Sequence, residues 1–143
     1  MRGSDDLERF VEAQAPVYAT ALRELREGRK RTHWMWFIFP QLRGLGLSPT
    51  AHLYGLVSLD EARAYLQHPL LGARLHQCAE ALAPWANRRS AEDIFGPIDA
   101  MKLRSSLTLF DNIEPNGTFG ESLTAFFNGV PDERTLALLN AQR

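Results

Sequence analysis

The fold is decided by residues 30–49, which read KRTHWMWFIFPQLRGLGLSP. Within them, residues 34–39 are six consecutive apolar side chains that include two of the three tryptophans and two of the eight phenylalanines. Buried aromatic side chains contribute much of the energy of a protein core. These residues are therefore predicted to form a core segment. A run of this length fits a buried strand as well as a buried helical turn, so its secondary structure stays open.

Helix signals follow this run. Ser48 before Pro49 has the form of an N-cap with proline at the first helical position, and the helix is expected to run to about Gly55. Ser58 and Glu61 have the spacing of a capping box, which predicts the start of the next helix. No stretch of the chain alternates convincingly between apolar and polar residues. We therefore predict an all-α fold, a single compact, bundle-like domain of several short helices over residues 1–143.

Further helices are indicated by caps, breakers and apolar residues at spacings of three and four. The expected starts are Ser4, Val17, Pro69, Ser90, Pro97, Phe119 and Asp132. The second of these helices is expected to close at Gly28, and the helix after Pro97 to reach about Asn112.

The composition is that of an ordinary globular protein. A chain of 143 residues can bury a sizeable single core, and its 45% hydrophobic and 23% charged residues argue against intrinsic disorder. A formal net charge of −1 gives no field that would attract nucleic acid or an anionic membrane, so neither is expected as a partner. The basic residues within 26–31 are interpreted as the solvated end of a helix.

The number of cysteines and the lengths of the apolar runs indicate in which cellular compartment the protein is expected. Cys78 is the only cysteine, so no intramolecular disulfide can form, and we interpret it as a buried small hydrophobe. No apolar run approaches the roughly 20 residues that span a bilayer, and residues 1–6 contain no apolar signal region. We expect a cytoplasmic protein.

Polar groups stand at both ends of the aromatic run, which suggests a pocket with an aromatic floor. His33 can act as an acid, a base or a hydrogen-bond anchor, although it can equally cap a turn beside the core. Gln41 closes the other end. Trp34 and Trp36 are candidates to stack on a ligand.

The loop after the aromatic run is a candidate anion site. Gly44 and Gly46 let the backbone approach a ligand closely, and Ser48 opens a helix whose N–H groups favour an anion. Arg43 adds a fork-shaped donor. The alternative is that the two glycines form only a turn.

The helix after Pro97 carries a polar stripe. Asp99, Lys102 and Ser106 follow at i, i+3 and i+7, and Ser105 lies on the neighbouring stripe. Serines within a helix lower its propensity slightly, which can mark a site or a contact between helices that needs small residues.

Many short segments over nearly the whole chain together resemble the bacterial "domain of unknown function" family number eighteen-ten. The resemblance implies a mainly helical protein without an established activity. Members are sometimes labelled calpastatin, but that inhibitor is a disordered chain poor in aromatic residues, whereas this composition demands a packed core. The matching residues are His33 to Gln41, Gly44 to Ser48, Tyr54-Gly55, Glu61-Ala62, Tyr65-Leu66, His68 to Gly72, Arg74-Leu75, Ile94 to Gly96, Asp99, Lys102, Ser105 to Phe110, Phe126-Phe127, Gly129 and Asp132.

The order of the helices also looks somewhat like the NADAR superfamily, whose members act on N-glycosidic linkages of the ADP-ribose type. This resemblance suggests binding or processing of a small phosphate-bearing, nucleotide-derived ligand, with N-glycosidic cleavage as the reaction. A glycosidase needs a carboxylate at the scissile bond, and Asp99 and Glu61 are the candidates, with Lys102 beside them. We expect neither a metal nor a cofactor. The alternative is a non-catalytic protein-interaction module in which the aromatic run is core or binding face. The oligomeric state stays open.

Overall fold

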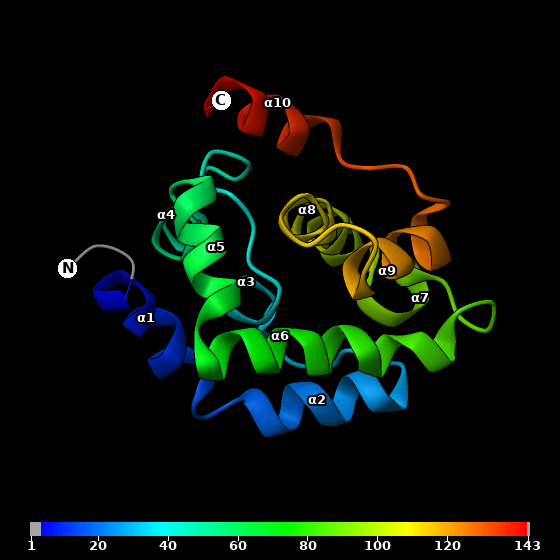
Figure 1. The fold of residues 1–143 in the computed structure, drawn as a ribbon. Helices are drawn as coiled ribbons and strands as arrows, with labels where there is room; N and C mark the ends of the chain where they lie inside the picture. Colours follow the sequence, from blue (N-terminus) through cyan, green and yellow to red (C-terminus); the bar gives the residue numbers. More distant parts are fainter. Residues whose placement is uncertain (1–3, 143) are drawn as a thin grey trace.

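The computed structural model describes residues 4–142, with side chains from residue 7 onward, so the cap predicted at Ser4 lies outside the described side chains. Over this range the fold is all-helical, as predicted, with no strand (Figure 1). The elements are α1 (Ser4–Gln14), α2 (Tyr18–Glu27), α3 (Met35–Ile38), α4 (Pro49–Tyr54), α5 (Leu59–Gln67), α6 (Pro69–Leu82), the 3-10 turn η1 (Ala83–Trp85), α7 (Ala91–Phe95), α8 (Pro97–Ile113), α9 (Thr118–Phe127) and α10 (Glu133–Gln142).

The aromatic run resolves as a single buried helical turn, α3, and not as a strand. Trp34 and Phe39, which flank this turn, are 1% and 0% exposed. After the turn, Leu42 forms an isolated parallel bridge with Leu56. The segment is thus a core element, as its composition predicted.

The predicted caps at the starts of α4 and α5 are present, with one difference. The Ser48 and Ser58 hydroxyls accept hydrogen bonds from the backbone N–H groups three residues later. The Glu61 carboxylate, however, accepts from the N–H of Val57, so the reciprocal bond of the capping box predicted at Ser58 is missing. The reciprocal pattern occurs instead at the start of α7, between Ser90 and Asp93.

Helix α8 runs through the middle of the molecule (Figure 1). It packs against α5, α7, α9 and α10, while α6 contacts α2, α5 and α9. Every residue from Ser105 to Phe110 is buried, because neighbours surround this part of the helix on all sides. Two of its polar residues are satisfied within the helix, because the Ser105 and Thr108 hydroxyls donate to backbone carbonyls one turn earlier.

No helix within residues 4–142 is long and apolar enough to cross a membrane. Cys78 is buried, in agreement with its interpretation as a core residue.

Candidate functional site

The two lysines of the chain meet at one carboxylate. The Lys30 Nζ lies 2.8 Å from Asp99 Oδ2, and the Lys102 Nζ lies 3.3 Å from Asp99 Oδ1. All three side chains are largely buried, with exposed fractions of 7% for Lys30, 19% for Asp99 and 20% for Lys102. We call these three residues the two-lysine site.

Each ammonium group also faces a tryptophan. The Lys102 Nζ lies 3.9 Å from the ring centre of Trp36, and the Lys30 Nζ lies 5.1 Å from that of Trp34. Both distances fall in the range of cation–π attraction. The site therefore places two positive charges, one negative charge and two aromatic rings within a small volume, and it keeps a net positive charge.

Lysine is rare in this chain, which has 14 arginines and only these two lysines. An ammonium is a compact point charge with three donors, whereas guanidinium is a wide planar fork, so the two are not interchangeable in a confined site. We therefore infer that positions 30 and 102 require a compact ammonium group and not a guanidinium group. Sequence reasoning missed Lys30 because it was grouped with the solvated arginines around it.

The connection between α2 and α3 positions Lys30. Its backbone N–H donates to the carbonyl oxygen of Ile94, 2.8 Å away, which ties this connection to α7 just before α8 begins. Helix α2 ends at Gly28, which adopts the left-handed conformation (φ +72°) that favours glycine. The indole of Trp85 packs closely against this glycine.

A buried carboxylate, Glu24, organises the same connection. It accepts hydrogen bonds from the backbone N–H groups of Arg31 and Thr32, from the Thr32 hydroxyl and from the Trp34 indole N–H. Burial alone would raise the pKa of Glu24, but these hydrogen bonds outweigh it and hold the pKa below its usual value. Sequence reasoning also missed Glu24, which carried no motif.

Two buried polar atoms lack a hydrogen-bond partner within the described part of the chain: Ser106 Oγ and Gln41 Oε1. Ser106 is 1% exposed and follows Lys102 by one helical turn. Gln41 and Trp36 line a narrow gap beside α4. Buried polar groups are normally paired, so these two atoms are available to a ligand or an ordered water.

Other predicted residues are engaged in the fold. Trp34 is 1% exposed and donates its indole N–H to Glu24, so it has no free face for a base. The carboxylate of Glu61 is held by both terminal nitrogens of Arg9 at 3.1 and 3.2 Å and by the Val57 N–H. The Ser105 hydroxyl donates to the carbonyl oxygen of Met101 in the same helix.

Arg43 and Ser48, predicted to hold an anion, each form a hydrogen bond with the backbone of α4. The Nε of Arg43 donates to the carbonyl oxygen of His52 at 2.8 Å, near the end of α4. Ser48 accepts from the backbone N–H of Ala51. Because α4 is only six residues long, its dipole offers little to an anion.

The remaining predicted residues lie around this loop and at the start of α3. Gly44 is exposed and has φ +109°, which explains the glycine by backbone conformation. Gly46 packs against α4, since a Cβ there would lie 2.8 Å from the Cβ of Ala51. His33 is exposed, and Trp36 is half-buried under Lys102. Of the predicted residues, the structure brings together Asp99, Lys102 and Trp36.

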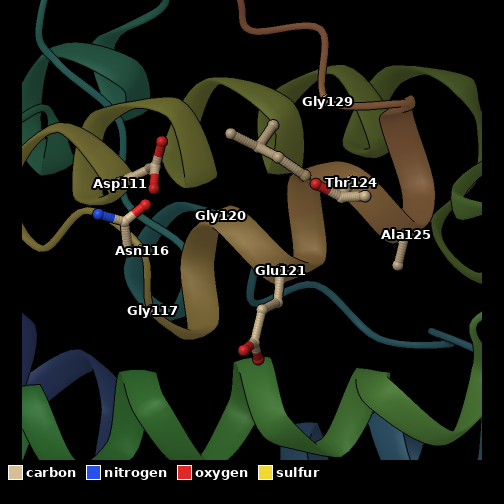
Figure 2. Close-up of a pocket in the computed structure, with 9 residues that line it drawn as sticks. Asp111, Asn116, Gly117, Gly120, Glu121, Thr124, Ala125 and Gly129 are labelled. Carbon is tan, nitrogen blue, oxygen red and sulfur yellow. The ribbon is translucent and has the colours of Figure 1, made fainter.

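A separate cleft of about 610 Å³ lies along α8 and α9 (Figure 2). Asp111 lies against α9, where a Cβ on Gly120 would come within 2.7 Å of its carboxylate. Burial raises the pKa of Asp111. Glu121 also lines the cleft but points away from Asp111 in Figure 2, and no lysine or arginine among the described residues lines it. This cleft is therefore unsuited to a phosphate.

Among the described residues, no three His, Cys, Asp or Glu side chains are placed to share a metal ion. The fold and the two-lysine site together define a small all-helical, single-domain protein with a partly buried cationic centre.

The comparisons identify its family. A family model described as "Protein of unknown function (DUF1810)" matches residues 4–139, and the chain belongs to this family. The chain is similar to the conserved hypothetical protein Rv1873 from Mycobacterium tuberculosis, whose crystal structure was determined at 1.38 Å. The two are 57% identical, with a TM-score of 0.91 over 94% of this chain and 96% of that one. No curated protein matches the chain. The family resemblance of the sequence is thus confirmed.

Proposed function

We propose that this protein binds a small phosphate-bearing, nucleotide-derived ligand at the two-lysine site, in the cytoplasm. The observation that carries the proposal is that the only two lysines of the chain converge on a single aspartate. A structural ion pair needs one cation for one anion. A second largely buried cation is costly unless an anion compensates it, and the tryptophan rings supply only part of that compensation.

The charges and donors of the site fit a phosphate. Two ammonium groups provide six N–H donors, and each has one close contact with Asp99. Lysine is a common phosphate ligand in proteins because it acts as a strong point charge. The hydroxyl of Ser106, one turn along α8 from Lys102, has no partner among the described residues but is enclosed by the fold, so it is left out of the proposed ligand contacts.

The nucleotide part of the proposal rests on the resemblance to the NADAR superfamily and on the half-buried ring of Trp36. If the ligand is an ADP-ribose N-glycoside, Asp99 is the carboxylate that would stabilise positive charge on the sugar as the bond from the anomeric carbon to the base nitrogen breaks. The base leaves with the electron pair of that bond, and water adds to the anomeric carbon and releases a proton to solvent. Glu61 is not part of this proposal, because Arg9 already engages both of its oxygens.

The interaction-module alternative receives less support. In that alternative the aromatic run is either core or a binding face, and Trp34, Met35, Ile38 and Phe39 are each 3% exposed or less, which leaves no binding face on these four side chains. These side chains are explained as core.

Isothermal titration calorimetry with ADP-ribose tests the proposal. We expect saturable binding to the wild type and at least about tenfold weaker binding to Lys102→Met, because a cation that contacts the phosphate is lost. Arg63→Met is the matched control, since it removes an equal charge from the exposed surface and should leave the affinity unchanged. Equal binding by Lys102→Met and the wild type would exclude the two-lysine site. Release of nicotinamide from NAD, followed by chromatography, tests the hydrolytic step separately.

A further inference from the structure

Asp99 bridges the two ammonium groups of the site. Each of its carboxylate oxygens faces a different ammonium group, Oδ2 toward Lys30 and Oδ1 toward Lys102. A phosphate oxygen can take the place of a carboxylate oxygen as the partner of an ammonium group. We infer, on the basis of the proposed function, that Asp99 sets the affinity of the site for anions: it occupies both lysines until a phosphate displaces it from Lys102.

The geometry indicates which lysine turns to the ligand. The contact from Lys30 is short, its side chain is only 7% exposed, and its backbone is tied to Ile94. The contact from Lys102 is longer, at 3.3 Å, and its side chain is more exposed. Lys30 therefore keeps Asp99 in place, while Lys102 exchanges the carboxylate for the ligand. The ring of Trp36, 3.9 Å from the Lys102 Nζ, continues to hold that ammonium during the exchange.

This arrangement selects ligands by their charge. A singly charged anion at Lys102 would carry the same charge as the Asp99 carboxylate that it displaces, so Lys102 would gain little. The nearby Asp99 would still repel this anion. A doubly charged phosphate gains more from the two ammonium groups than it loses to that repulsion, since each attraction scales with the charge of the ligand and two cations face one anion. The site therefore favours dianions, such as a phosphate monoester or the diphosphate of ADP-ribose, over monoanions.

A pair of ligands with matched shapes tests this selection. Phenyl phosphate and benzenesulfonate both carry a tetrahedral anion on a phenyl ring, but at about pH 8 the phosphate monoester is doubly charged and the sulfonate singly charged. We expect calorimetry to show tighter binding of phenyl phosphate to the wild type. In Asp99→Asn, phenyl phosphate should bind about tenfold tighter than in the wild type, because a neighbouring negative charge is removed while both lysines remain. The affinity for the sulfonate should rise less, because the repulsion that it loses scales with its smaller charge, so the preference for phosphate should widen.

Asp111→Asn is the matched control. It removes the same charge from the same helix, at a carboxylate whose cleft contains no lysine or arginine. Its affinities should stay within about twofold of the wild type. If the wild type binds phenyl phosphate and Asp99→Asn binds it equally or more weakly, the inference about Asp99 is overturned and the proposed function stands. If neither protein binds any phosphate ligand, both are overturned.

A second measurement does not depend on the folding of a variant. With only two lysines in the chain, protein labelled with ¹⁵N-lysine gives two side-chain signals. Titration of the wild type with phenyl phosphate should shift the Lys102 Nζ signal strongly and the Lys30 Nζ signal only slightly. Equal shifts, or a larger shift at Lys30, would overturn the assigned roles of the two lysines.

Discussion

Replacement of Glu24, in the last turn of α2, is expected to destabilise the protein, because its carboxylate holds the α2–α3 connection through four hydrogen bonds. In Glu24→Ala, the indole N–H of Trp34 loses its acceptor in a place that water does not reach, since Trp34 is 1% exposed. An orphaned buried donor costs about 1–3 kcal/mol. The N–H groups of Arg31 and Thr32 lie at exposed residues and can bind water, so each loss adds about 0.5–1 kcal/mol. The expected total is about 2–5 kcal/mol.

The stabilisation by Glu24 is expected to depend on pH. The pKa of Glu24 is held below its ordinary value of 4.5 in the folded state. Its contribution to the free energy of unfolding is therefore fully present above that value, and it is lost as the pH falls through the lower folded-state pKa. The difference in stability between the wild type and Glu24→Ala should shrink in that acidic range.

Urea denaturation followed by circular dichroism measures both effects. Glu24→Gln keeps one acceptor for the indole but loses the charge, so it should fall between the wild type and Glu24→Ala. Glu27→Gln is the control: its partner Arg31 is 56% exposed, and an exposed ion pair contributes little. If Glu24→Ala unfolds within about 0.5 kcal/mol of Glu27→Gln, the assigned role of the Glu24 carboxylate is refuted.

Three further predictions concern α6. Gly72→Ala should cost about 3 kcal/mol or more in urea denaturation, because its Cβ would lie 2.0 Å from the backbone oxygen of Leu66, and a retained stability would disprove this clash. Burial of the His76 ring lowers its pKa, but the hydrogen bonds to Glu114 and to the Gly72 carbonyl outweigh burial and raise the pKa above its ordinary value. The charged ring therefore stabilises the fold fully below pH 6.5, and this stabilisation is lost as the pH rises through the folded-state pKa. His76→Gln should therefore destabilise the protein more at about pH 6 than at about pH 9, and an equal loss at both would contradict the role of this charge. Burial raises the pKa of Cys78 to about 12, so its thiol should react with a disulfide reagent only after urea unfolds the protein, and fast labelling of the native state would show that the thiol is accessible.

The helices could be predicted because their signals are local. Ser48 and Ser58 cap the helices that follow them, and Gly28 ends α2 through a single left-handed residue. Each of these features depends on residues within one turn. The secondary structure of the aromatic run was harder to predict, because six apolar residues in a row are compatible with a buried strand and with a buried helix. Only its packing in the core decides that it is a helical turn.

The two-lysine site could be predicted only in part. Asp99 and Lys102 share one helix, so their spacing placed them on one stripe. Lys30 joins them from a connection far away in the sequence, and nothing near it indicates this contact. Likewise, two tryptophans of the same short run differ in exposure: Trp34 is buried in the core and Trp36 lies under Lys102, and the run of apolar residues does not indicate which of them is buried.

A crystal structure of the protein grown with ADP-ribose tests the central claim most directly. The account predicts electron density for the diphosphate within hydrogen-bond distance, about 2.7–3.2 Å, of the Lys102 Nζ, with Lys30 still in contact with Asp99. Density for ADP-ribose in the cleft beside Asp111, or at any other place while both lysines still contact Asp99, would contradict the account.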